Sequence, residues 1–150
     1  MEDMLASIKE AIKNKEGKVE FKGLMSLRAG IKEIGETDKD VLGWFTLFRR
    51  DGKCMRYYHA QYPLIGMTLP EEVMCPLGIR TFDTYKVDFK EALKKMKELK
   101  CGDKFVALSL YWPLTPECVE PYWHIRTNLG NQIAVGANSG KTECYKSSVL

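Results

Sequence analysis

The stretch WHIRTNLGNQIAVGANSGK, residues 123–141, has the pattern of two short strands around a tight turn. Trp123 and Ile125 alternate with polar residues, as expected when successive side chains of a strand point to opposite faces of a sheet. The central residues NLGN favour a turn, because glycine and asparagine tolerate positive φ angles. Ile133 and Val135 then resume the apolar face. This stretch therefore predicts a β-hairpin.

A second stretch with the same pattern lies in the first half of the chain. Residues 45–57, FTLFRRDGKCMRY, alternate in a similar way, and the central Asp51-Gly52 pair is a strong hairpin signal. We therefore expect residues 41–49 and 122–128 to occupy equivalent places in the fold.

A helical pattern precedes each predicted hairpin. Residues 3–15 and 88–99 carry apolar side chains at helical spacing, opposite lysines and glutamates. Asp88 is a suitable N-cap for the second helix. A first strand is expected after each helix, at residues 19–24 and 105–112, whereas the following residues 24–34 also suit a helix. The order predicts an α+β fold with helices packed on an antiparallel β-sheet, built as an internal repeat of helix, strand, strand and strand.

Length and composition indicate a single compact chain. The sequence has 150 residues, of which 45% are hydrophobic and 29% charged, as in ordinary globular proteins. The net charge of +3 is too small to indicate nucleic acid as a partner. The predicted repeats, about residues 1–62 and 84–150, are joined by a proline-containing connector at residues 63–83.

The N-terminal residues, the apolar runs and the cysteines of the chain bear on its cellular location. No signal peptide is visible, and no apolar run approaches the ~20 residues that cross a membrane. Five cysteines, an odd number and far apart, indicate reduced thiols. We therefore expect a soluble cytoplasmic protein with no membrane partner. The cysteines are Cys54, Cys75, Cys101, Cys118 and Cys144.

Residues 136–142, GANSGKT, look at first like a phosphate-binding loop. That motif needs four residues between its glycines and a helix after it, but here three residues separate the glycines and little chain follows. A turn after a strand is the better interpretation. No cysteine pair has the spacing of a zinc site, so neither a cofactor nor a metal is predicted.

Aromatic residues occur as neighbours in the predicted strands, for example Trp44-Phe45 and Tyr122-Trp123. Strand alternation places the two members of such a pair on opposite faces, so a second aromatic face is expected away from the helices. Such a face is unusual on a lone monomer. It indicates a binding surface, unless the connector from Pro63 to Pro76 covers it. The predicted ligand-binding or partner-binding residues are Trp44, Phe48, Tyr58, Tyr111, Tyr122 and His124.

The last part of the chain resembles the PepSY domain family. Residues 121–125 (PYWHI), 131–135 (NQIAV) and 137–141 (ANSGK) fit the family's usual ending of two strands around a turn and a small residue before a Ser-Gly-Lys tail. The resemblance covers about half of the chain, and the first half looks like a more diverged copy. It implies a cystatin-like α+β shape and a role in regulating or inhibiting peptidases, with no catalytic residues.

The leading hypothesis is a non-enzymatic binding or regulatory module. Its sheet face would take a peptide, a small ligand or a partner protein, most simply a second copy in a homodimer. The alternative is a small enzyme that uses a cysteine and histidine pair near residues 111–124, where Cys118 precedes His124.

Overall fold

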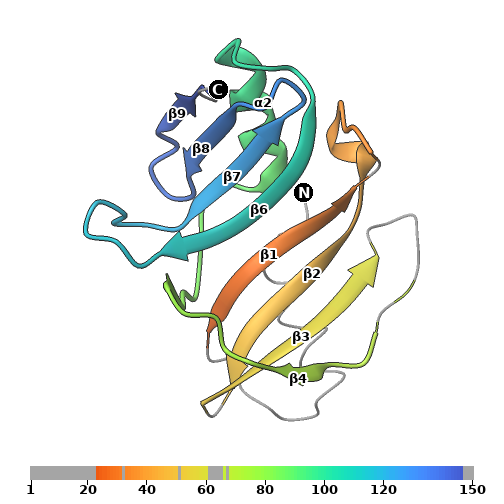
Figure 1. Cartoon of the computed structure of the whole chain (residues 1–150), viewed down its shortest axis with the longest axis vertical. Coiled ribbons are helices and arrows are strands. Elements are labelled where there is room, and N and C mark those ends of the chain that lie inside the picture. Colours follow the sequence, from red (N-terminus) through yellow and green to blue (C-terminus); the bar gives the residue numbers. More distant parts are fainter. Residues whose placement is uncertain (1–22, 32, 51, 61–65, 67, 147–150) are drawn as a thin grey trace.

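The structure is a computed structural model that describes residues 23–31, 33–50, 52–60, 66 and 68–146. Within this part of the chain, nine antiparallel strands form a sheet in the order β4-β3-β2-β1-β6-β7-β8-β9, and β5 pairs with β6 (Figure 1). The strands are β1 (Leu24–Ile31), β2 (Val41–Arg50), β3 (Lys53–Ala60), β4 (Glu71–Val73), β5 (Ile79–Arg80), β6 (Phe105–Pro113), β7 (Tyr122–Thr127), β8 (Gln132–Gly136) and β9 (Thr142–Tyr145).

Both predicted hairpins are confirmed. β2 pairs with β3, and β7 pairs with β8, each through a short turn. The turn glycines Gly52 and Gly130 have φ angles of 77° and 84°, which a side chain would make unfavourable. The two groups of consecutive strands meet where residues 26–28 of β1 pair with residues 109–111 of β6.

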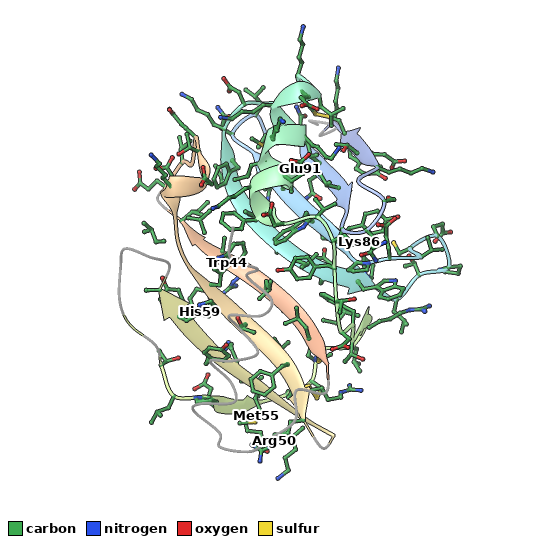
Figure 2. All side chains as sticks on the ribbon, turned by 180° about the vertical axis from the view of Figure 1, so that it is seen from behind. Trp44, Arg50, Met55, His59, Lys86 and Glu91 are labelled. Carbon is green, nitrogen blue, oxygen red and sulfur yellow. A yellow bond between two sulfur atoms is a disulfide. The ribbon has the colours of Figure 1, made fainter. Side chains whose placement is uncertain are left out.

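One α-helix occurs in the described residues, α2 (Phe89–Glu98), together with a short 3-10 helix, η1 (Asp38–Asp40). The predicted cap is confirmed, because the Asp88 side chain accepts a hydrogen bond of 2.9 Å from the backbone N–H of Glu91. Figure 2 shows α2 lying across the back of the sheet. The buried apolar face of the helix consists of Phe89, Ala92, Leu93 and Met96. Neither described helix is long and apolar enough to cross a membrane.

The predicted α+β fold with a helix-strand-strand-strand repeat and a cystatin-like shape is wrong. The molecule is mainly an antiparallel β-sheet, with 49% of the described residues in strands and 11% helical. The first predicted helix, residues 3–15, lies outside the described residues, and so does most of the strand expected at residues 19–24. The first described strand is β1. A register shift in its pairing with β2, between Leu24 and Ser26, accompanies the burial of both Leu24 and Leu27. Their spacing of three resembles that of a helix, which made residues 24–34 ambiguous.

The described part of the connector forms two short strands. β4 pairs with β3 at the edge of the sheet, and β5 pairs with the end of β6. Between them, Met74 and Leu77 are almost fully exposed. Residues 71–73 and 79–80 extend the sheet, whereas Val73, Met74 and Pro76 line a pocket together with Arg28 and Phe45 on one of its faces. The described part of the connector therefore covers part of the face that carries Phe45, while residues 61–65 and 67 lie outside the described part.

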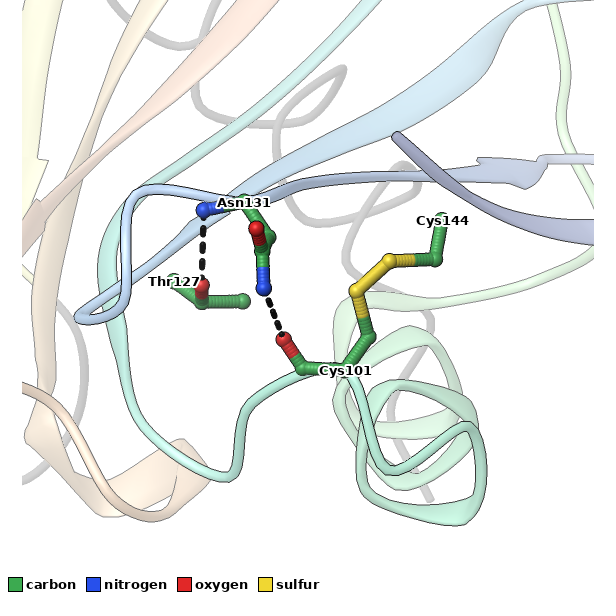
Figure 3. Close-up of a disulfide and its surroundings, with 4 residues drawn as sticks. All are labelled: Cys101, Thr127, Asn131 and Cys144. Atoms are coloured by element: carbon green, nitrogen blue, oxygen red, sulfur yellow. Dashed lines mark hydrogen bonds between the residues drawn. A yellow bond between two sulfur atoms is a disulfide. The ribbon is translucent and has the colours of Figure 1, made fainter. Parts of the chain in front are cut away.

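Four of the five cysteines form disulfides, so the expectation of reduced thiols is wrong for them. Cys54 bonds to Cys75, with 5.1 Å between their Cα atoms, and Cys101 bonds to Cys144, with 6.3 Å (Figure 3). Both separations are usual for disulfides. The first bond joins β3 to the connector, and the second joins the end of α2 to β9. Cys118 is free.

Candidate functional site

The sheet has two unlike faces. The helix face packs against α2 and carries the core, whereas no described helix covers the other face, called the open face below (Figures 1 and 2). Figure 1 looks onto the open face. Laterally paired residues form a row across it from β3 to β9, in the order Tyr58, Phe45, Arg28, Ser109, His124, Ala134 and Glu143.

Trp44 and Phe48 do not belong to the open face, contrary to the prediction. Their exposed fractions are 0% and 1%, and both lie in the core. The Trp44 ring meets the rings of Phe89 and Trp123 edge-on, with centroids 5.2 and 5.8 Å away. Alternation separates Trp44 from Phe45 correctly, but it does not say which of the two points inward. Phe45 takes the place on the open face that was assigned to Trp44.

The other four predicted residues lie half-buried on the open face, but not together. Tyr58 lies over Gly30 and Gly43, and a side chain at Gly43 would collide with its ring. Three strands separate β3, which carries Tyr58, from β7, which carries Tyr122 and His124. The structure therefore groups Tyr111, Tyr122 and His124 and leaves Tyr58 apart.

The Tyr111 and His124 rings are stacked, with centroids 3.9 Å apart and planes inclined by 14°. Tyr122 lies at the side of the same histidine, with its ring centroid 6.4 Å away. Burial lowers the pKa of His124 to about 4, although a hydrogen bond with the Tyr111 backbone acts in the opposite direction. The imidazole is therefore neutral at neutral pH. Its buried Nε2 atom has no hydrogen-bond partner within the described structure.

Beside this stack, β7, β8, β9 and the loop before β7 enclose a pocket of about 280 Å³. Ala134 lies between His124 and Glu143 in the lateral row. Because its side chain is small, the centre of the pocket is left open above it. The walls are Tyr122, Tyr145 and the loop residues Glu117 and Cys118. The lining residues are Glu117, Cys118, Tyr122, His124, Gln132, Ile133, Ala134, Lys141, Glu143 and Tyr145.

Negative charge affects the tyrosines of this pocket. The Tyr145 hydroxyl donates a hydrogen bond to Glu143, which raises the pKa of Tyr145. Burial raises the pKa of Tyr122, and the carboxylates Glu120 and Glu143 raise it further. Both phenols therefore stay protonated at neutral pH and can donate hydrogen bonds.

Glu120, which the sequence did not single out, lies next to the pocket. It is 8% exposed, and its Oε1 atom accepts hydrogen bonds of 2.8 Å from the backbone N–H groups of Asn138 and Ser139. Gly136 allows this approach, because a Cβ atom there would come within 2.7 Å of the same oxygen. The loop that resembles a phosphate-binding motif is thus a turn, as predicted, and its amides bind the chain's own carboxylate.

The hydrogen bonds of Glu120 predict a dependence of stability on pH. Burial alone would raise its pKa, but the bonds from Ser139 and Asn138, with the nearby charge of Lys141, outweigh burial and lower the pKa from the usual 4.5. A lowered folded-state pKa means that the carboxylate stabilises the fold above pH 4.5. This contribution is lost as the pH falls through the folded-state pKa.

Glu120→Gln is therefore expected to lower the free energy of unfolding by about 1 kcal/mol near neutral pH, because charged acceptors form stronger hydrogen bonds than neutral ones. Urea denaturation at about pH 7 and about pH 3 measures this, and the difference from the wild type should shrink at the lower pH. Glu117→Gln, in an exposed position of the same loop, is the control. An equal loss at both pH values would show that the charge of Glu120 is not responsible.

Comparison with known proteins gives no relative: no family model, no curated protein and no solved structure matches the chain. Among the described residues, no three histidine, cysteine, aspartate or glutamate side chains gather in a way that could hold a metal ion. The site is therefore interpreted from its own geometry.

Proposed function

We propose that the protein is a non-enzymatic binding module that takes a ligand on the open face of its sheet, at β7, β8 and β9. The observation that carries this proposal is the pocket of about 280 Å³ beside the Tyr111–His124 stack. Ligand pockets are concave, with apolar and aromatic walls and a few polar groups, and this pocket is at the small end of their range. It suits a small ligand or one side chain of a bound peptide or partner protein.

The resemblance to the PepSY family stays a prediction and supports a regulatory role for such binding. A peptide or protein partner would reach the pocket from the open face, where Arg28 and Phe45 extend the surface towards β2. The guanidinium of Arg28 lies 4.8 Å from the ring centroid of Phe45, which keeps both side chains on this surface. A second copy of the chain is one such partner.

The alternative function, an enzyme with a cysteine and histidine pair, has one observation in its favour. Cys118 is free and lines the same pocket as His124. However, the ring of His124 is stacked on Tyr111, and its Nε2 atom has no hydrogen-bond partner in the described structure, whereas a base that activates a thiol is hydrogen-bonded to it. If iodoacetamide modifies Cys118 much faster than it modifies a small thiol such as glutathione in solution, this result would favour the enzyme.

The cytoplasmic location stays a prediction, and the two disulfides argue against it. Structural disulfides persist in oxidising compartments and are rare in the cytosol. We therefore favour a location in which Cys54–Cys75 and Cys101–Cys144 remain oxidised.

The proposed function predicts where ligands bind. In an NMR screen of small molecules and short peptides, we expect hits to shift the signals of Tyr122, His124 and Ala134. Tyr122→Ser should lower the affinity for these ligands, because it removes a wall of the pocket while leaving the core intact. Tyr58→Ser is the matched control, since Tyr58 is a half-buried tyrosine of the same face outside this pocket. Hits that bind only elsewhere, or no hits, would contradict the proposal.

A further inference from the structure

The charged groups around the pocket are mainly acidic. Glu117 and Glu143 line it as exposed carboxylates, and Lys141 is the ammonium group among its lining residues. The carboxylate of Glu120 lies close enough to raise the pKa of Tyr122. Its hydrogen bonds with two backbone amides keep it ionised. The pocket is therefore lined by two carboxylates and one ammonium group, and a third carboxylate, that of Glu120, lies beside it.

The walls of the pocket are aromatic. Tyr122, His124 and Tyr145 line it, and the neutral His124 adds no positive charge. Aromatic rings attract cations through the negative potential of their faces, and this attraction is strongest where water is excluded. The Tyr145 hydroxyl donates a hydrogen bond to Glu143, so a ring and a carboxylate are held next to each other.

We propose that the pocket binds an organic ammonium ion, supplied either by a small free amine or by a lysine side chain of a partner. This inference rests on the proposed function and gives its ligand a chemical class. The aromatic walls contact the carbon atoms next to the nitrogen, and Glu117 and Glu143 balance its charge. An anion of the same size would face the same carboxylates and be repelled.

Choline and 3,3-dimethyl-1-butanol test the inference, because they have similar shapes and differ in charge. Choline is expected to bind about tenfold more tightly in an NMR titration that follows Tyr122 and Ala134. Glu143→Gln should weaken choline binding about fivefold, because it removes one carboxylate near the cation. Tyr145→Leu, at a side chain that is 57% exposed, should weaken it without unfolding the protein. Glu98→Gln, an exposed position of α2, is the matched control.

A lysine-containing peptide and its acetylated form distinguish the two sources of the ammonium ion. Binding of the peptide, lost on acetylation, indicates a lysine of a partner, whereas binding of choline without the peptide indicates a free amine. Equal affinity for choline and the neutral alcohol, or no binding of choline and peptide, overturns the inference. If the NMR screen finds neutral or anionic ligands in this pocket and no ammonium ions, the proposed binding function is retained and the inference that its ligand is an ammonium ion is rejected.

Discussion

Replacement of Trp44 by serine is expected to lower the free energy of unfolding by about 3–5 kcal/mol, which is much of the stability of a typical domain. Trp44 has no exposed surface, and its ring packs against Phe89 of α2 and Trp123 of β7. The change would leave a cavity between the two groups of strands and place a hydroxyl group in it. Urea denaturation followed by tryptophan fluorescence and circular dichroism measures the loss.

The control for this experiment is Tyr122→Ser, which removes an aromatic side chain from the open face. Because Tyr122 is half-buried beside a pocket, its loss should cost much less stability than the loss of Trp44. Comparable, small effects of the two changes would mean that Trp44 is not in the core. The assignment of the two sheet faces would then be wrong.

Replacement of both Cys101 and Cys144 by alanine is expected to lower the free energy of unfolding by about 4 kcal/mol. The bond closes a loop between residues 43 positions apart, and a cross-link of this length restricts the unfolded chain considerably. It also attaches β9, an edge strand of four residues, to the end of α2. Figure 3 shows the neighbouring contact, in which the Asn131 side chain donates a hydrogen bond of 3.0 Å to the carbonyl of Cys101. Thermal denaturation without reductant measures the loss.

Cys118→Ala is the matched control, because it removes a thiol and no cross-link. Alkylation of the unfolded wild type without reductant should modify Cys118 and leave the other four cysteines unmodified. Modification of all five under these conditions would show that the disulfides are absent.

Local pattern was sufficient to predict both hairpins and α2. In residues 45–57 and 123–135, apolar side chains alternate on either side of glycine-containing turns, and backbone geometry at such turns depends on a few neighbouring residues. Asp88 caps α2 through a bond to a residue three positions away. The loop at residues 136–141 was likewise identified as a turn from its glycine spacing. Each of these features depends on contacts between residues close together in sequence.

Features that depend on distant residues required the tertiary structure. Alternation divides Trp44 from Phe45, but the inward residue is decided by contacts with Phe89 and Trp123, far away in the chain. The disulfide pairing has the same origin, since five cysteines allow many combinations and only the fold brings the partners together. In the candidate site, Tyr122 and His124 were predicted, whereas Glu120, Glu143 and Tyr145 were not. Charged and polar residues near strand ends are usual at any protein surface. Glu143 and Tyr145 gain significance only when the pairing of β8 and β9 places them beside Ala134 and Gln132, and Glu120 only when the fold brings it to the amides of Asn138 and Ser139.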